Sequence, residues 1–426
     1  MYNQLSINLL NLLLSLSDAL DLASPELSFH QMRTAFIVWE LAKVAKMDPQ
    51  ETSRLFSAAL LHDIGALSLE HKIEVHRGSV YDPQIHCILG ERILSDVPFF
   101  ADSAVIVRYH HTKWTNLADR SKEPLIFSSQ ILMLADILER SVDRKKFILH
   151  QDQELISKIV SLSGSSLNPE AVDLFKAVCY REDFWLDLTS SRLYSLLLHA
   201  GPGKNEYIDQ EMLHPISILF RNIIDFRSKM TATHSSGVAA AAVQLSKYVG
   251  LTELELDLMG IAGNLHDLGK LVIPTSILDK ADKLTKAEFA VIRQHTYFTY
   301  TVLTTIGGIM TVAEWAAFHH ERLDGTGYPF HLKGDRLNLG SRIMAVADIF
   351  TALAEDRPYR KGLDRQGVLS ILQDMGKRNG LDRMVLRALE ENYDAIEEVT
   401  KAKQAQAKKF YDDAFSIPWM PDQRAS

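Results

Sequence analysis

A pattern of histidine and aspartate residues occurs twice along this chain of 426 residues. The segment "LLHDIGAL" around His62 resembles "NLHDLGKL" around His266, which lies 204 residues later. The same offset relates His30 to His234. Self-similarity at a fixed offset is typical of a duplicated structural unit. We therefore expect two related domains, each with its own histidine cluster.

A second spacing supports the duplication. Two histidines lie 24 residues apart in each half, another histidine directly follows the later one, and an Ala-Asp pair closes the half. These positions are His86, His110, His111 and Asp136 in the first half, and His295, His319, His320 and Asp348 in the second. Ten of the sixteen histidines belong to the two sets. Chance placement would not reproduce both spacings.

The apolar pattern predicts an all-α fold. Apolar residues recur at steps of three and four, as in "ELDLMGIAGNLHDLGKLVI", and sustained alternation of apolar and polar residues is missing. Helix starts are indicated at Asp48, Asn168, Thr252 and Thr285, each a capping residue at the head of such a pattern. The leucine-rich start "INLLNLLLSLSDAL" has no preceding basic residue and contains polar interruptions, so it predicts an amphipathic helix and not a signal peptide.

The domain boundary is predicted where the helical pattern breaks. The segment "HAGPGKNEY" is rich in glycine and proline, and a single helical pattern follows it. We expect an N-terminal domain over 1–200, a linker helix over 201–227 and a C-terminal domain over 228–400. The tail over 401–426 is expected to be solvated, either as a polar helix or as a frayed end.

Charge and cysteine content limit the classes of partner. A net charge of −8 gives no general attraction to polymeric nucleic acid or to an anionic membrane. No apolar run approaches the length of a membrane span. Cys87 and Cys179 stand at no motif spacing, which fits a reducing cytoplasm.

The second histidine set has the composition of a metal centre. Its members are His234, His266, Asp267, His295, His319, His320 and Asp348. Imidazole and carboxylate together are typical ligands of Mn, Fe, Zn or Ni. Five histidines and two carboxylates are too many for one tetrahedral ion but suit two six-coordinate ions. Neighbours on a helix diverge by about 100°, so we expect His266 and Asp267 to point apart, with Asp267 bridging the ions.

The motif "HDLGK" followed by "HHERLDGTGYP" resembles the HD-GYP branch of the HD superfamily of metal-dependent phosphohydrolases. The resemblance extends from about Ser228 to Asn392 and includes "IPTSILDKADKLTKAEF", "GSRIMAVADIFTAL" and "RPYRKG". It implies an all-helical fold and hydrolysis of cyclic dinucleotides to linear ones. The chain departs from the family pattern at Asn264, Thr296 and Thr299, none of which is a ligand position.

The resemblance also implies roles for further residues. Asp267 and Lys270 would be catalytic, with Lys270 one helical turn after His266, where it could neutralise a phosphate or protonate the leaving 3′ oxygen. Lys270, Tyr328, Arg357 and Arg360 would contact the substrate. Two divalent transition-metal ions, Fe, Mn or Ni, would serve as cofactors. Some family members bind a third ion through a glutamate before the first histidine, where Met230 stands here.

The first half keeps the ligands and loses the groups expected to contact substrate. Its set is His30, His62, Asp63, His86, His110, His111 and Asp136, with Glu26 one turn before His30. Ala66 replaces the lysine, and "TKW" replaces the segment that ends in Gly-Tyr-Pro. Three roles stay open for this half: metal binding with poor catalysis, nucleotide sensing, or packing and dimerisation.

The function predicted from these features is a cyclic-dinucleotide phosphodiesterase acting on 3′,3′-cyclic GMP-AMP or cyclic di-GMP. A degenerate HD half followed by a complete HD-GYP half resembles the bacterial cyclic GMP-AMP phosphodiesterases. Two alternatives remain: a binding effector that does not hydrolyse the nucleotide, and an HD hydrolase of another phosphate ester. The expected partner is a cyclic dinucleotide, with a second copy or a signalling protein as a further candidate. Polymeric nucleic acid and membranes are not expected partners.

Overall fold

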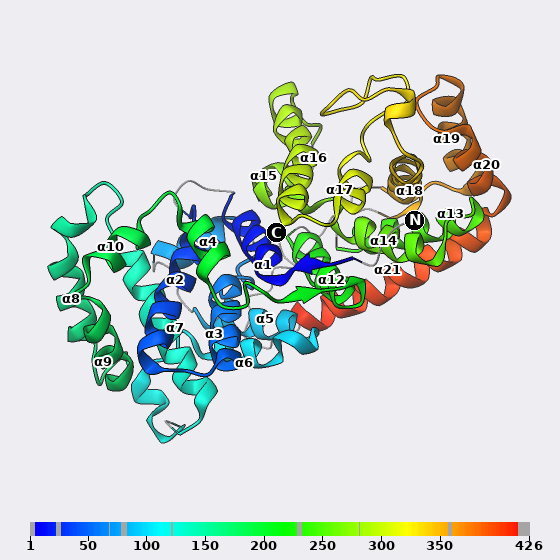
Figure 1. Cartoon of the computed structure of the whole chain (residues 1–426). Coiled ribbons are helices and arrows are strands. Elements are labelled where there is room, and N and C mark those ends of the chain that lie inside the picture. Colours follow the sequence, from blue (N-terminus) through cyan, green and yellow to red (C-terminus); the bar gives the residue numbers. More distant parts are fainter. Residues whose placement is uncertain are drawn as a thin grey trace. The chain divides into compact units, whose positions relative to one another are not determined.

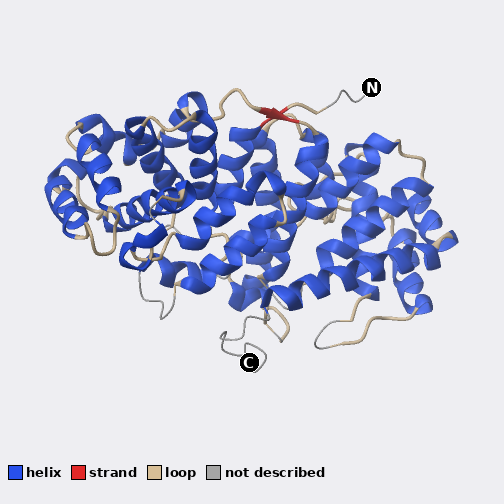
Figure 2. Ribbon diagram, turned by 90° about the horizontal axis from the view of Figure 1, so that it is seen from below, coloured by secondary structure: helices blue, strands red, loops and turns tan. Residues whose placement is uncertain are grey.

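The structure, a computed structural model, describes residues 5–22, 27–67, 69–77, 83–120, 122–227, 232–280, 282–356 and 360–415. These residues are helical almost throughout, as Figure 2 shows. The sheet among them consists of two short strands, β1 (Ile7–Asn8) and β2 (Tyr207–Ile208). The prediction of an all-α fold is confirmed. No helix in the described ranges is both long and apolar enough to cross a bilayer.

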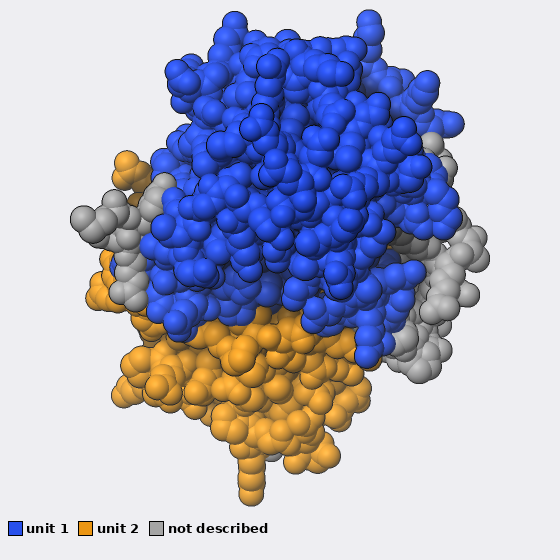
Figure 3. Space-filling model, turned by 90° about the vertical axis from the view of Figure 1, so that its right-hand side faces the viewer, with its two compact units in different colours: residues 1–7, 208–426 blue, residues 8–207 orange. Residues whose placement is uncertain are grey.

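Two compact units divide the chain, and Figure 3 colours them separately. One is Asn8–Tyr207, and the other joins Met1–Ile7 to Ile208–Ser426, so both boundaries fall inside the two strands. Helix α12 (Gln210–Phe226) covers most of the segment predicted as a linker. It packs against α14 (Glu253–Leu265) with its apolar face buried. The segment expected to connect the domains therefore belongs to the core of one of them.

The unit Asn8–Tyr207 is built around the helices that carry the first histidine set. Helix α2 (His30–Ala45) packs against α3 (Pro49–Leu61) and α7 (Pro124–Ser141), and α6 (Ala101–Tyr109) packs against α3, α7 and α5 (Gln84–Ser95) (Figure 1). The other helices of this unit are α4 (Leu69–Arg77), α8 (Asp152–Ser161), α9 (Pro169–Val178), α10 (Glu182–Leu188) and α11 (Leu193–Ala200).

Helix α1 (Leu9–Asp21) forms where the leucine-rich start predicts an amphipathic helix, and it is more enclosed than expected. Its leucines are buried, and so are Ser15, Ser17 and Asp21 on its other sides. The helix packs against α2, α3 and α11. Asn11 and Asp18, seven residues apart and so on one face, are only partly buried, and this narrow polar face is what the amphipathic pattern predicted.

The second unit repeats the arrangement around α13 (His234–Tyr248). This helix packs against α14, α18 (Leu339–Ala354) and α21 (Tyr393–Phe415) (Figure 1). Helix α16 (Lys286–Ile306) packs against the 3-10 helix η5 and against α17. The remaining bounds are η5 (Leu268–Val272), α15 (Thr275–Leu278), α17 (Met310–Ala317), α19 (Arg365–Lys377) and α20 (Arg383–Glu391).

The predicted helix starts are confirmed. Thr252 and Thr285 each form a complete capping box with the glutamate three residues later. Asp48 and Asn168 accept hydrogen bonds from amides of the first turn, ahead of a proline at the first helical position. These helix starts could be predicted from the sequence because a cap involves only residues that are close together in sequence.

As far as 415, the C-terminal segment forms the polar helix that was one of the two alternatives expected for it, and most of its residues from 401 to 413 are exposed. Helix α21 is continuous from Tyr393 to Phe415, and one of its faces packs along α13. Phe410 and Tyr411 lie against the ring of Phe226, at centroid distances of 5.6 and 5.2 Å. The helix is therefore part of the second unit as far as it is described, and residues 416–426 lie outside the described residues.

Candidate functional site

The geometry of the second His-Asp pair is set by the end of a helix. Helix α14 ends at Leu265, His266 is its C-cap, and Asp267 leaves the helical path with φ −97° and ψ 13°. As a result His266 Nε2 lies 3.2 Å from Asp267 Oδ2. The expectation that these side chains diverge was wrong because they do not sit inside one helix. For the same reason Lys270 lies on η5 and not one turn along α14, and its Nζ donates to Asp267 Oδ2 at 2.5 Å.

A close approach of two chain segments holds this turn in place. A Cβ atom on Gly269 would lie 1.9 Å from the carbonyl oxygen of His295, so only glycine fits there. Thr299 accepts a hydrogen bond from the Gly269 amide at 2.9 Å and donates one to the His266 carbonyl at 3.0 Å. Thr299, a departure from the family pattern in the sequence, therefore ties the turn after α14 to α16.

The histidine rings are oriented by their own helices. His266, His295 and His319 each donate Nδ1–H to the carbonyl oxygen three residues earlier, at 2.8, 2.7 and 2.7 Å. A carbonyl can only accept, so Nδ1 carries the proton and the lone pair remains on Nε2. Burial lowers the pKa of His295 to about 4 and of His319 to about 3, so both rings are neutral near pH 7.

The donor atoms converge in two neighbouring groups. One contains His234, His266 and Asp348, the other contains His295, His319 and His320, and the atoms of each lie within 4.8 Å of one another. Asp267 lies between the groups, since Oδ2 is 3.2 Å from His266 Nε2 and Oδ1 is 3.4 Å from His295 Nε2. The structure thus brings together all seven residues predicted as ligands.

The chemistry of the donor set fits divalent metal ions. His266 Nε2 is buried and has no hydrogen-bond partner among the described residues. A buried nitrogen acceptor left open in this way is costly unless a ligand satisfies it. Burial would raise the pKa of Asp267, but the neighbouring His266 and Lys270 hold it well below its usual range, so the carboxylate is ionised. Neutral imidazoles and ionised carboxylates are the forms that bind transition metals.

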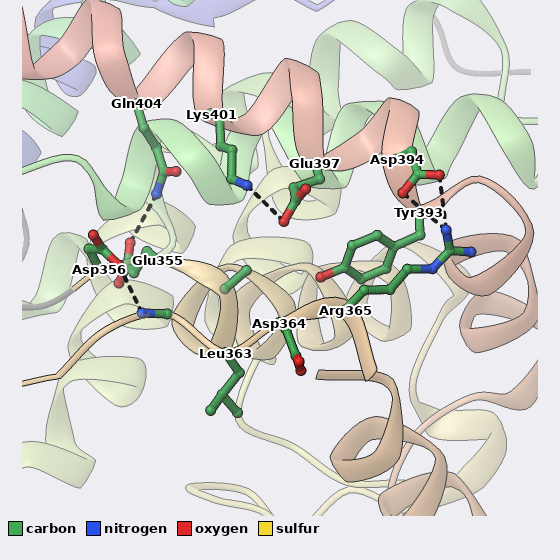
Figure 4. A pocket seen from close by; sticks show the side chains of 12 residues that line it. Glu355, Asp356, Leu363, Asp364, Arg365, Tyr393, Asp394, Glu397, Lys401 and Gln404 are labelled. Atoms are coloured by element: carbon green, nitrogen blue, oxygen red, sulfur yellow. Dashed lines mark hydrogen bonds and ion pairs between the residues drawn. The ribbon is translucent and has the colours of Figure 1, made fainter. Parts of the chain in front are cut away.

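Glu355 is a member of the site that the sequence did not reveal. Its Oε1 lies 3.1 Å from His234 Nδ1, and its Oε2 accepts from Gln404 Nε2 of α21 at 3.0 Å (Figure 4). Burial would lower the pKa of His234, but Glu355 and Asp348 raise it to about 10. No spacing rule predicts this contact, because Glu355 follows the end of α18 and reaches back to the start of α13.

A cavity of about 640 Å³ lies beside Glu355, between the end of α18, the start of α19 and α21 (Figure 4). Its wall carries the ion pairs of Arg365 with Asp394 and of Lys401 with Glu397, at 2.9 and 3.0 Å. Glu355 therefore lines this cavity and contacts the histidine cluster at the same time.

The first half builds a corresponding cluster. The structure brings together His30, His62, Asp63, His86, His110, His111 and Asp136, as expected from the repeat. His62 and His110 again donate Nδ1–H to the carbonyl three residues earlier, at 2.9 and 2.6 Å. Three members were not expected from the sequence: His76, Glu139 and Arg140. Glu139 and Arg140 follow Asp136 by three and four residues on α7, a helical spacing that could have indicated them.

Comparisons with known proteins agree with this duplication. One family model, described as an HD domain, matches residues 28–141, and a second with the same description matches residues 219–385. The chain belongs to the HD-domain family. Each HD domain contains one of the two histidine clusters.

One relative and one solved structure cover most of the chain. A 3′3′-cGAMP-specific phosphodiesterase 1 of Vibrio cholerae is 29% identical over 405 residues, which is 91% of this chain and 92% of that protein. A cyclic di-GMP phosphodiesterase of Pseudomonas aeruginosa is 34% identical over 192 residues, 45% of this chain and 46% of that protein. The crystal structure of a cyclic GMP-AMP-specific phosphodiesterase of V. cholerae has a TM-score of 0.63 and 23% identity, and covers 91% of this chain and 98% of that one. That likeness shows a shared fold.

In the C-terminal HD domain, Tyr328 of the Gly-Tyr-Pro segment lies next to the cluster. Its ring centroid is 4.9 Å from that of His320, and the guanidinium of Arg293 lies 4.9 Å from the Tyr328 ring. The buried carboxylate of Glu321 accepts hydrogen bonds from the amides of Phe330 and Leu332, at 2.7 and 3.0 Å. Glu321 therefore holds the segment that places Tyr328, a role the sequence did not reveal.

The predicted substrate contact Arg360 hydrogen-bonds the end of a helix. Arg360 donates to the carbonyl oxygens of Ala352 at 2.5 Å and of Leu353 at 3.3 Å, so its guanidinium caps the C-terminal end of α18. Its contact with substrate stays a prediction. Arg357, Glu26 and Met230 lie outside the described residues.

Proposed function

We propose that this protein hydrolyses a cyclic dinucleotide, 3′,3′-cyclic GMP-AMP or cyclic di-GMP, to the linear 5′-phosphorylated dinucleotide. The observation that carries the proposal is the convergence of two donor groups on either side of Asp267 in the C-terminal HD domain. The names of the relatives support the substrate class. The Gly-Tyr-Pro segment beside His320 supports assignment of this domain to the HD-GYP branch.

The cofactors we propose are two divalent transition-metal ions, with Fe, Mn and Ni as the candidates. His234, His266 and Asp348 would hold one, and the other would be held by His295, His319 and His320. Asp267 would be shared, because its two oxygens face different groups. When bound, such a pair lowers the pKa of water and offsets the charge that develops on phosphorus.

The protein residues would orient the phosphate and handle the proton. Lys270 Nζ contacts Asp267 Oδ2, and its side chain is 19% exposed, so the ammonium lies at the cluster and remains accessible. From there it can pair with a non-bridging phosphate oxygen or donate a proton to the leaving 3′ oxygen. Tyr328 and Arg293 form an aromatic and cationic wall beside His320, suited to stacking and to phosphate contact.

We assign catalysis to residues 228–400 and a regulatory or structural role to residues 1–200. The first HD domain has Ala66 in place of Lys270 and lacks the Gly-Tyr-Pro segment. We place the reaction in the cytoplasm, where the two free, buried cysteines would stay reduced. A second copy of the chain, forming a homodimer, or a signalling protein would contact the regulatory half.

Product analysis tests the proposal. Full-length protein loaded with Mn or Fe is incubated with each cyclic dinucleotide, and the products are separated and identified. We expect the linear 5′-phosphorylated dinucleotide from at least one of them. Recovery of both nucleotides bound but intact would support a non-hydrolytic effector. Turnover of other phosphate esters alone would support a different HD hydrolase.

A further inference from the structure

The N-terminal HD domain contains a cation at a position of its cluster where the C-terminal domain has an uncharged residue. Arg140 follows Asp136 by one turn of α7, and its Nη2 lies 2.7 Å from Asp136 Oδ2. Ala352 stands at the corresponding position after Asp348. The Arg140 side chain is only 17% exposed and also donates to the Val75 carbonyl of α4 at 3.0 Å. The guanidinium is therefore fixed inside the cluster.

Arg140 neutralises a carboxylate that the repeat would assign to a metal ion. Asp136 corresponds to Asp348, which belongs to the donor group of His234 and His266 in the other domain. Guanidinium stays protonated at every accessible pH and cannot act as a ligand. A divalent ion beside Asp136 would meet this positive charge at close range. Like charges in a buried site repel strongly. Lys270 makes a similar contact with Asp267 in the other domain, but the guanidinium of Arg140 is bound by the Val75 carbonyl as well.

The histidines on this side of the N-terminal cluster also satisfy each other. His30 Nε2 and His62 Nε2 lie 3.2 Å apart, within hydrogen-bonding distance. In the C-terminal domain, His266 Nε2, the counterpart of His62 Nε2, has no hydrogen-bond partner among the described residues. His62 Nε2 is thus paired with a second imidazole, whereas its counterpart His266 Nε2 is not.

A second group of four donors lies in the same cluster, and two of its atoms, His86 Nε2 and His110 Nε2, are 3.3 Å apart. Asp63, His86, His110 and His111 have donor atoms within 4.8 Å of one another. Asp63 Oδ1 and His111 Nε2 are buried and have no hydrogen-bond partner among the described residues. A buried polar atom without a hydrogen-bond partner is costly unless a ligand binds it. One carboxylate with three imidazoles is a common set for a single divalent transition-metal ion.

We propose that the N-terminal HD domain binds one divalent transition-metal ion through Asp63, His86, His110 and His111, and that Arg140 occupies the electrostatic role of a second ion. The duplicated site has in this way become mononuclear in the first domain. The inference concerns a different domain from the proposed reaction. Absence of turnover would refute the proposed function and leave this inference standing.

The test counts metal ions in full-length protein whose C-terminal cluster is disabled by Asp267→Ala and His295→Ala. The protein is saturated with Mn²⁺ alone, passed through a desalting column, and analysed by elemental analysis and electron paramagnetic resonance. We expect one Mn²⁺ per chain with the six-line spectrum of an isolated ion. Adding His110→Ala should remove that ion. Zero or two ions in the parent protein would overturn the proposal.

Substitutions of Arg140 separate its charge from its packing. In the same background, Arg140→Gln should raise the content to two ions per chain and give a spin-coupled spectrum, whereas Arg140→Lys should leave it at one. Arg54→Gln is the matched control, since it breaks an arginine–aspartate pair at the surface of the same domain and should change nothing. A folded Arg140→Gln protein, judged by circular dichroism, that still binds one ion would refute the role of Arg140. If Arg140→Gln does not fold, two ions in Arg140→Lys would refute it.

Discussion

Glu355 Oε1 lies 3.1 Å from His234 Nδ1, so the first ligand candidate of the C-terminal cluster is held by a carboxylate from beyond the end of α18. The other carboxylate oxygen is held by Gln404 of α21. A carboxylate behind a ligating histidine fixes the ring and increases the basicity of the nitrogen that faces the metal. In the N-terminal domain, Glu139 makes the same contact with His30 at 2.5 Å, although it comes from a different position on its helix.

We expect Glu355→Gln to weaken metal binding by about 10- to 100-fold, because a neutral amide no longer fixes the charge and orientation of His234. The measurement is a Mn²⁺ titration by calorimetry on metal-free protein. Gln404→Ala is the matched control, since it removes only the outer hydrogen bond and should have a smaller effect. Equal affinity in Glu355→Gln and the unmodified protein would show that this contact does not support the site.

Substitution of the two His-Asp pairs should have unequal effects. His266→Ala or Asp267→Ala is expected to abolish turnover and to release metal, because each removes a donor from the C-terminal cluster. The corresponding His62→Ala should leave a substantial residual rate. Turnover assays and elemental analysis of the three variants measure the activity and the metal content. Full activity in either C-terminal variant would contradict the assignment, as would loss of activity in His62→Ala with the C-terminal metal still bound.

Lys270→Met should reduce kcat by about 10²- to 10⁴-fold while the metal content stays unchanged, because the ammonium acts on the substrate and is not itself a ligand. Lys280→Met provides a control, since Lys280 pairs with Glu288 at 2.7 Å on the surface of the same domain. Steady-state kinetics together with metal analysis distinguishes a lower kcat from a loss of metal. An unchanged kcat would exclude Lys270 from the chemical step.

Asp18 should make stability depend on pH. Burial raises the pKa of this α1 carboxyl to about 6, against about 3.9 in an unfolded chain. Between these values the folded state holds a proton that the unfolded state releases, so stability falls as pH rises from about 4 to 6. Asp18→Asn should therefore stabilise the N-terminal unit at pH 7, by about 1–3 kcal/mol, and have little effect near pH 4.

Thermal unfolding at the two pH values measures the effect of Asp18→Asn. Asp173→Asn serves as the control, because Asp173 is exposed and its pair with Lys176 contributes little. A Tm difference for Asp18→Asn that is the same at both pH values would indicate a packing effect and not a proton linkage.

The sequence by itself determined the helical class, the duplication and the seven ligand candidates of each cluster. Periodic apolar residues and local caps at Thr252 and Thr285 need only neighbours in sequence, and the spacings of 32 and 24 residues repeat because each half builds the same helices. The direction of the ligand atoms also follows locally. His266, His295 and His319 all turn Nε2 inward because Nδ1 bonds to a carbonyl three residues earlier.

The tertiary structure decided which groups control those ligands. His266 and Asp267 face each other because α14 ends between them, and no periodicity marks that end. Glu355 and Thr299 reach the cluster from helices far away in sequence. Arg140 contacts Asp136 and so adds a positive charge beside the N-terminal ligand set. Each of these contacts depends on how helices pack, and side chains that meet only through packing share no fixed spacing along the chain.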